Sequence, residues 1–283
     1  MKNSNFIKQI LLPTDFSSHS TCAYQFALEL AQKSGAGLTL LHVIEPPYNF
    51  ASELEETREV LKKFSLSRLK ELKESKSGID LDKIEIDTRV RTGMTVPTVL
   101  EQIRKTGADL VVMGSKGATG LKKVLFGSIA TDIMEKAPIP VLTVPDSESP
   151  PKIKKLLFTT DFRKGDLDNL KWLFELAGHY KAGVHALHVT RALDFETEIR
   201  YRGFEDYIRD HNALEKLKFD LVENDRLTDG IAGFLNKNPV SIIAINRYYK
   251  SLYQALLKKD HTREIIDHFR MPIIVLPGSV TAT

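Results

Sequence analysis

The sequence contains a single cysteine, Cys22, so an intrachain disulfide is excluded. A lone free thiol is typical of proteins in a reducing compartment, and we expect Cys22 to be a small buried residue near the start of a helix. Charge of neither sign dominates, because 40 Lys and Arg face 37 Asp and Glu, a net charge of +3. This balance gives no indication of nucleic-acid or membrane-surface binding.

Long hydrophobic runs are missing as well. Residues 1–9 lack a signal-type hydrophobic region, and the apolar run at 10–12 is cut off by Pro13. No run approaches the roughly 20 residues that a membrane-spanning helix needs. With 42% hydrophobic and 27% charged residues, the composition is that of a globular protein. We therefore expect a cytoplasmic protein whose partners include neither a membrane nor a nucleic acid.

The chain repeats itself once. An offset of 146 aligns KQILLPTDF at 8–16 with KKLLFTTDF at 154–162, and LHV at 41–43 with LHV at 187–189. Further along, an offset of 132 aligns 110–113 with 242–245 and 140–145 with 272–277. A repeat this long indicates duplicated domains, because solenoid units run to roughly 20–50 residues. We predict two domains, 1–146 and 152–283, joined by a polar, proline-bearing linker.

Each copy alternates short apolar runs with amphipathic stretches. In the first copy we expect strands at 9–13, 38–44, 83–91, 110–113 and 141–144, and helices at 20–34, 52–75, 96–105 and 128–137. The second of these helices should bury a stripe of Leu61, Phe64, Leu69 and Leu72. Such alternation predicts right-handed crossovers and a parallel sheet of about five strands. Ligands of open parallel sheets bind beyond the carboxyl ends of the strands, where Asp15, Val43 and Gly114 fall.

A glycine-rich loop follows the strand expected at 110–113. It reads Gly114-Ser115-Lys116-Gly117, then nine residues, then Gly127-Ser128. Glycines let the backbone approach an anion, and a helix starting at Ser128 offers unpaired N–H groups at the positive end of its dipole. Lys116, Lys122 and Lys123 could offset phosphate charge. The alternative is a surface turn with Ser128 as a simple N-cap. The spacing is neither that of the Walker loop nor that of the dinucleotide fingerprint.

These motifs resemble the universal stress protein family. The resemblance rests on ILLPTDFS at 10–17, on Gly-x2-Gly-x9-Gly-Ser, on ADLVVMG at 108–114 and on PVLTV at 140–144. It covers both halves, the first more strongly. It implies an α/β fold with two tandem copies of an open, mainly parallel five-stranded sheet flanked by helices, of the adenine nucleotide alpha-hydrolase-like or Rossmann-like type. It also implies bound ATP, with Mg as an optional companion, across the carboxyl edge of the sheet.

The resemblance also implies roles for single residues. Asp15 and the backbone of Val43 would contact the adenosine, Met113 and Gly114 would lie by the ribose, and the later loop residues would bind the phosphates. The expected binding residues are Pro13, Thr14, Asp15, Val43, Met113, Gly114, Lys116, Gly117, Gly127, Ser128 and Ile129. Asp15 has two interpretations of equal weight. It contacts the nucleotide or a divalent ion bridging its phosphates, or it caps a turn in an Asp-x-Ser sequence.

The second copy has lost the loop. At the offset of 132, the positions of Gly114, Gly117, Gly127 and Ser128 hold Asn246, Tyr249, Lys259 and Asp260. A tyrosine cannot replace a glycine whose backbone must touch phosphate, and Asp260 would place an anion where phosphates should lie. We therefore predict one ATP per chain, in the first domain. Residues 246–250 combine aromatics with cations that could bind another ligand, but a drifted surface loop is the favoured interpretation.

The histidines carry weaker signals. His42, His185 and His188 fall on expected strands, where packing is favoured over a ligand role. His19 falls near the start of the first helix, and we favour a solvated turn over a position facing the crevice. We find no Ser/His/Asp or Cys/His set that could be catalytic.

The sequence therefore favours an ATP-binding stress-response protein that acts as a nucleotide-dependent regulatory or protective module and is not an enzyme. In the family such domains often pair through their final strands, here 141–144 and 273–276, and a homodimer of whole chains is left open. One alternative is a slow ATPase or a nucleotidyl or phosphoryl transferase, against which the lack of an evident base counts. The other is a nucleotide-free scaffold.

Overall fold

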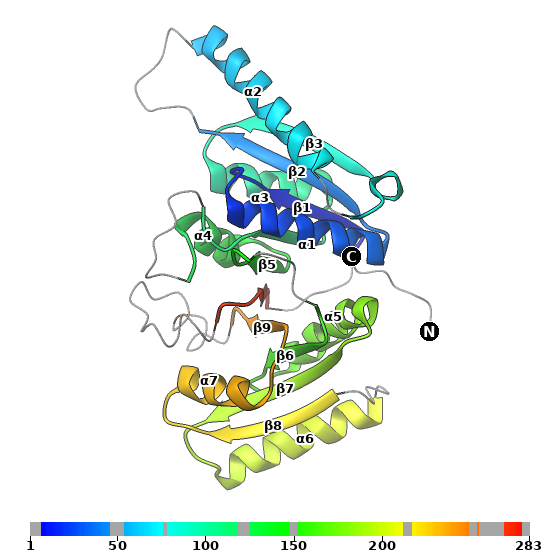
Figure 1. The fold of residues 1–283 in the computed structure, drawn as a ribbon. Coiled ribbons are helices and arrows are strands. Elements are labelled where there is room, and N and C mark those ends of the chain that lie inside the picture. The colour runs from blue at the N-terminus through cyan, green and yellow to red at the C-terminus, as the bar shows by residue number, and fades with distance from the viewer. Residues whose placement is uncertain are drawn as a thin grey trace. The chain divides into compact units, whose positions relative to one another are not determined.

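The computed structural model describes residues 7–45, 54–75, 78–117, 125–147, 152–211, 217–248, 254 and 269–278. It divides into two units (Figure 1). Unit 1 contains the strands up to Val144, and unit 2 contains the strands from Lys155 onward. The division between these strands falls where the sequence predicts the linker. No helix among the described residues is both long and apolar enough to cross a membrane.

Unit 1 is an open, fully parallel sheet in the order β3-β2-β1-β4-β5. Its elements are β1 (Gln9–Pro13), α1 (Ser18–Ser34), β2 (Gly37–Ile44), α2 (Leu54–Glu74), β3 (Ile86–Thr92), α3 (Thr95–Thr106), β4 (Leu110–Gly114), α4 (Ser128–Lys136) and β5 (Val141–Val144). The predicted strands and helices are confirmed, with ends within about three residues, a usual uncertainty for element boundaries. From β1 the strand order proceeds through β2 to β3 on one side of the sheet, and β4 and β5 are added on the other side. The order thus changes direction between the neighbours β1 and β4, and a crevice is expected at their carboxyl ends.

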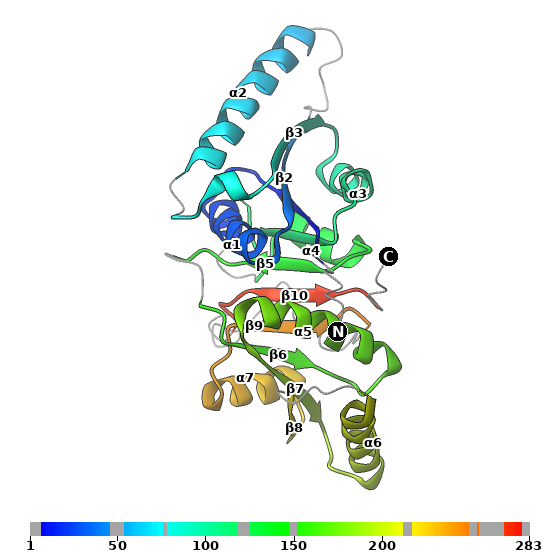
Figure 2. The ribbon, with the colours of Figure 1, turned by 90° about the vertical axis from the view of Figure 1, so that its right-hand side faces the viewer.

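Helices cover both faces of this sheet (Figure 2), with α1 and α2 on one face and α3 and α4 on the other. The central strands are buried on both sides, which explains their unbroken apolar sequences. Capping sets the first helix: the Ser17 hydroxyl accepts a hydrogen bond of 3.3 Å from the N–H of Ser20. The helix ends at Gly35, which has a φ of +74° in the left-handed region.

Two expectations about burial in unit 1 are wrong. Leu69 and Leu72 are buried as predicted, but Leu61 and Phe64 are 40% and 61% exposed. The reason is geometric, because the N-terminal half of α2 runs beyond the edge strand β3 (Figure 1). Cys22 is only half-buried, and its thiol donates to the carbonyl of Ser147 at 3.1 Å.

Unit 2 repeats the architecture in the order β10-β9-β6-β7-β8, again parallel. Its elements are β6 (Lys155–Thr159), α5 (Lys164–Tyr180), β7 (Gly183–Thr190), α6 (Phe195–His211), β8 (Leu217–Glu223), α7 (Leu227–Lys237), β9 (Ile242–Asn246) and β10 (Ile273–Leu276). β6 and β7 pair in the register of β1 and β2, displaced by 146 positions. The ring of Phe204 on α6 packs on Phe219, and that of Phe234 on α7 packs on His185, from opposite faces of the sheet.

One conformation recurs at the same place in both units. Phe16 and Phe162, each just after the first strand, have φ values of +62° and +55°, which is unusual for aromatic residues. Each ring packs on a histidine of the next strand, with centroids 4.6 Å and 4.5 Å apart. These histidines, His42 and His188, hold the preceding turn by a ring-nitrogen hydrogen bond to a threonine carbonyl, at 2.8 Å and 2.7 Å. Both histidines pack against the turn, as predicted, and each also lines a cavity of its own unit.

Candidate functional site

A cavity of about 200 Å³ opens at the carboxyl edge of unit 1, where β1 and β4 are neighbours. All eleven residues expected from the sequence line it: Pro13, Thr14, Asp15, Val43, Met113, Gly114, Lys116, Gly117, Gly127, Ser128 and Ile129. The expectation missed Ser20, Leu41, His42, Thr95 and Ala130. Thr95 follows the carboxyl end of β3, so the same strand-end rule could have identified it.

Gly114 ends β4 directly against the first turn of α1. A Cβ placed on Gly114 would lie 2.8 Å from the Cβ of His19 and 2.9 Å from its carbonyl carbon. Glycine is therefore required at this position for packing, whatever the ligand. His19 lies in the first turn of α1, half-buried, with its Cβ against the end of β4.

The two ends of the glycine loop meet. The N–H of Gly127 donates a hydrogen bond of 2.8 Å to the carbonyl of Ser115, and a Cβ on Gly127 would lie 3.5 Å from the Cα of Lys116. Gly127 is the N-cap of α4 and supplies no capping side chain. Ser128 is the first helical residue, so the simple N-cap interpretation of Ser128 is wrong. The first N–H groups of a helix have no intrahelical acceptor, and those of α4 lie at this cavity.

Asp15 divides its carboxylate between two tasks. One oxygen, Oδ1, accepts a hydrogen bond of 3.1 Å from the N–H of Ser17, which confirms the turn-capping interpretation. The other, Oδ2, lies 2.8 Å from the place of a Cβ on Gly117, at the cavity. Contact of Oδ2 with a ligand stays a prediction. Within the described part of the chain, no group of three or more His, Cys, Asp or Glu could hold a metal ion.

A second acidic residue fixes the rim of the cavity. The carboxylate of Glu45, just past β2, accepts a hydrogen bond of 2.8 Å from the N–H of Thr95, the first residue of α3. The hydrogen bonds from Thr95 lower the pKa of Glu45. A carboxylate at the start of a helix is also favoured by the helix dipole. Glu45 therefore holds Thr95 at the cavity.

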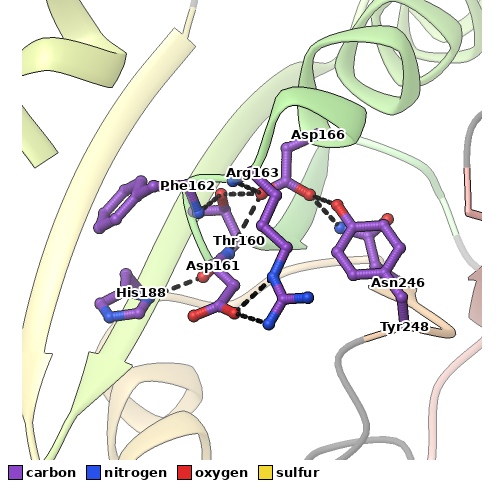
Figure 3. A network of polar contacts seen from close by, with 8 residues as sticks. All are labelled: Thr160, Asp161, Phe162, Arg163, Asp166, His188, Asn246 and Tyr248. Atoms are coloured by element: carbon purple, nitrogen blue, oxygen red, sulfur yellow. Dashed lines mark hydrogen bonds and ion pairs between the residues drawn. The ribbon is translucent and has the colours of Figure 1, made fainter. Parts of the chain in front are cut away.

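The same edge of unit 2 is filled by its own side chains (Figure 3). Asn246 stands at the position of Gly114, is fully buried, and donates a hydrogen bond of 2.6 Å to Asp166. Asp166 occupies the position of Ser20 and is also fully buried. Asn169, at the position of Ala23, donates in turn to the side-chain amide oxygen of Asn246. Larger polar side chains thus stand in unit 2 at the positions where unit 1 has the small residues Gly114, Ser20 and Ala23.

The counterpart of His19 is Gly165. In unit 1 the glycine of this helix–strand contact lies on the strand, at Gly114, whereas in unit 2 it lies on the helix, at Gly165. A Cβ on Gly165 would lie 2.8 Å from the carbonyl oxygen of Gly278 and 3.6 Å from the Tyr248 ring. The Tyr248 hydroxyl donates to Asp166, and the Arg163 guanidinium lies 5.4 Å from the centre of the tyrosine ring (Figure 3). A cavity of about 190 Å³ in unit 2 has a different lining: Asp161, Phe162, His188, Asp194, Glu196, Thr197 and Arg200.

Several sequence expectations concern residues outside the described ranges. They are the phosphate-neutralising Lys122 and Lys123 and the replaced loop positions Tyr249, Lys259 and Asp260.

Comparison with known proteins gives concordant matches. Residues 7–145 match the model of the Universal stress protein family. The chain is 32% identical over 144 residues to a universal stress protein of Methanocaldococcus jannaschii, covering 50% of this chain and 83% of the relative. It is 28% identical over 160 residues to a putative universal stress protein of Staphylococcus epidermidis, covering 56% of this chain and 95% of the relative.

Solved structures match the fold over nearly the whole length. A universal stress protein from Archaeoglobus fulgidus superposes with a TM-score of 0.73 at 20% identity, covering 96% of this chain and 97% of the other. A putative universal stress protein from Pseudomonas aeruginosa gives 0.63 at 18% identity, covering 97% and 95%. The α/β architecture with mainly parallel sheets is therefore shared. On the sequence identity to its relatives, the chain belongs to the universal stress protein family.

Proposed function

We propose that this chain is a cytoplasmic ATP-binding protein that acts as a nucleotide-dependent regulatory or protective module in a stress response. One observation carries the proposal: Gly114, Gly117 and Gly127 bound a cavity at the end of β4, beside the uncapped start of α4. Backbone N–H groups and a helix N-terminus form an anion site without further groups. Membership of the universal stress protein family supports the role in stress.

The residues of the cavity fit a nucleotide. The N–H groups at the start of α4 would hold phosphate oxygens, and Lys116 would offset part of their charge. The apolar side chains of Pro13, Val43 and Met113 would cover a base and sugar at the β1–β2 side. Since Asp15 is the single carboxylate among the described lining residues, a Mg ion would be held chiefly by the phosphates themselves.

We propose one nucleotide per chain. In unit 2 the side chains of Asn246 and Tyr248 occupy the edge that is open in unit 1. The second unit would act as a built-in partner, paired through the final strands β5 and β10. High hydrogen-exchange protection along both strands in the full chain is expected for this pairing. Rapid exchange along either strand would contradict it.

We also propose binding without ordinary catalysis. Asp15 is the acidic residue among the described residues that line the cavity, and Ser17 already engages one of its oxygens, which leaves it poorly placed to act as a general base. Release of ADP or AMP by the purified full chain should stay below about 1 s⁻¹, an ordinary enzyme rate. Faster turnover that disappears in Gly127→Trp would establish the transferase or ATPase alternative instead.

Calorimetric titration of the full chain with ATP tests the central proposal. We expect one site per chain, and loss of binding in Gly127→Val, because this side chain would stand in the loop while the backbone φ of −74° accepts it. Gly183→Ala in unit 2, with nothing within 4 Å of the new Cβ, is the matched control and should bind normally. Absence of copurified adenine nucleotide together with absence of binding would overturn the proposal in favour of a scaffold.

A further inference from the structure

We propose that His19, which lies behind the wall of the unit 1 cavity at Gly114, takes up a proton when a nucleoside polyphosphate binds there. The inference rests on the proposed nucleotide binding and adds to it a residue and a proton linkage. It starts from the contact between the first turn of α1 and the end of β4, where the His19 Cβ lies 2.8 Å from the place of a Cβ on Gly114. Because Gly114 lines the cavity, His19 lies directly behind its wall.

The charged groups around His19 come from three other segments. Asp15 precedes α1, Lys116 belongs to the glycine loop, and Asp146 follows β5. Asp146 is held by the hydroxyl of Ser18, at 2.8 Å, on the same helix turn as His19. On α1 itself the next titratable group along the helix is the thiol of Cys22, which contacts Asp146 and Ser147. Two of the three charged neighbours, Asp15 and Lys116, line the cavity.

In the ligand-free protein this setting favours the neutral imidazole. Burial lowers the pKa of His19, Lys116 lowers it further, and Asp146 and Asp15 oppose the change. Polyphosphate in the loop would alter the balance, because its negative charge offsets Lys116 and adds attraction for an imidazolium. A proton would then enter with the ligand, and affinity would rise as the pH falls.

Unit 2 lacks this device. The repeat position of His19 is Gly165, and the space beside it is taken by Tyr248. The histidine and the open cavity therefore occur together in unit 1, and both are replaced in unit 2. This coincidence is expected if His19 serves the ligand as well as the packing of α1.

The test is ATP affinity of the full chain across about pH 6 to pH 8.5, for the natural protein and for His19→Gln. Glutamine retains the Cβ that contacts Gly114 but cannot take a proton. Between the free and bound pKa values of His19, the natural protein should lose up to about tenfold more affinity per pH unit than the variant, the limit for one linked proton. Protonation of the ligand phosphates, with a pKa of about 6, affects both proteins equally.

Two further measurements separate this linkage from a merely structural role. His19→Lys keeps a cation at every pH in this range, so its affinity should follow the shallow profile of His19→Gln. The imidazole signal of His19, assigned by its absence in the variant, should titrate at higher pH after ATP is added. Unchanged circular dichroism of both variants checks the fold.

The outcomes are distinct. Binding with the same pH profile in the natural protein and in His19→Gln would overturn the proton linkage and leave the nucleotide site standing. No ATP binding by either protein at any pH would overturn the proposed function and this inference together. A steeper profile for the natural protein, with an upward shift of the His19 titration, supports both.

Discussion

Asn246 donates a hydrogen bond of 2.6 Å from its side-chain amide to the carboxylate of Asp166, and both side chains are fully buried in unit 2. Tyr248 donates to the same oxygen. The other oxygen accepts from the Thr160 hydroxyl at 2.7 Å and from two backbone N–H groups, of Asp161 and Arg163, at 3.1 Å. Burial raises the pKa of Asp166, and the hydrogen bonds from Thr160, Arg163 and Asp161 oppose this rise.

Removal of this carboxylate should destabilise unit 2. Asp166→Ala would leave several buried donors without an acceptor, at a cost of about 3–5 kcal/mol. Trp172 reports on unit 2 alone, because it is the only tryptophan and is buried on α5, the helix that carries Asp166. Urea unfolding followed by its fluorescence gives the free energy. Ser20→Ala, at the repeat position in unit 1, is the control and should leave the Trp172 transition in place. A loss below about 1 kcal/mol for Asp166→Ala would contradict the expected dependence on these bonds.

Gly114 and Gly127 should differ in their tolerance of alanine. In Gly114→Ala the methyl group would meet the backbone of His19 at 2.9 Å, so unit 1 should lose about 1–3 kcal/mol through overpacking. In Gly127→Ala the nearest atom is at 3.5 Å and the φ of −74° is ordinary, so the stability change should stay within about 0.5 kcal/mol. Thermal unfolding, with hydrogen exchange of the α1 and β4 peptides, measures both. Equal stability of the two variants would contradict this view of the α1–β4 contact.

His185 should make unit 2 less stable in mild acid. Its Nε2 contacts the carboxylate of Asp220, while its Nδ1 is buried and has no hydrogen-bond partner in the described part of the chain. Burial lowers the pKa of His185 despite the opposing effect of Asp220. Below pH 6.5, the ordinary value, the unfolded chain binds this proton more readily than the folded chain. The free energy of unfolding should therefore fall as the pH drops from about 7 to about 5.

The matched variant for this pH dependence is His185→Gln, whose amide can still donate to Asp220. Its stability, followed through Trp172 fluorescence over the same pH range, should fall less steeply. Identical slopes in both proteins would assign the acid sensitivity to other groups.

At position 162 a glycine variant should be more stable than an alanine variant, the reverse of the usual order. Its φ of +55° disfavours every residue with a Cβ, at about 1–2 kcal/mol. Both Phe162→Ala and Phe162→Gly lose the ring contacts with His188, Tyr201 and Phe204. Only the glycine variant relieves the backbone, so Phe162→Gly should be about 1 kcal/mol more stable than Phe162→Ala. Urea unfolding measures the difference, and a more stable alanine variant would show that the turn relaxes.

The sheet and the lining of the cavity were predictable because each depends on local sequence. Strands buried on both faces require unbroken apolar runs, and the strand-end rule then brings Asp15, Val43 and Gly114 to one edge. The contact of His19 with Gly114 was not predictable, since it joins residues about a hundred positions apart through the register of α1 on β4. The predicted burial of Phe64 was wrong for another reason. Helical periodicity shows which side of α2 is apolar but not where the sheet beneath it ends.

The glycine of the helix–strand contact lies on β4 in unit 1 and on α5 in unit 2. This difference limits how unit 2 can evolve toward the arrangement of unit 1. Restoring glycine at position 246 alone would remove a donor from Asp166, and restoring histidine at position 165 alone would collide with the carbonyl oxygen of Gly278. Each of these two single changes therefore passes through a less stable protein. Recovery of an open cavity in unit 2 would therefore need changes at positions 165 and 246 together with changes in the residues that contact them.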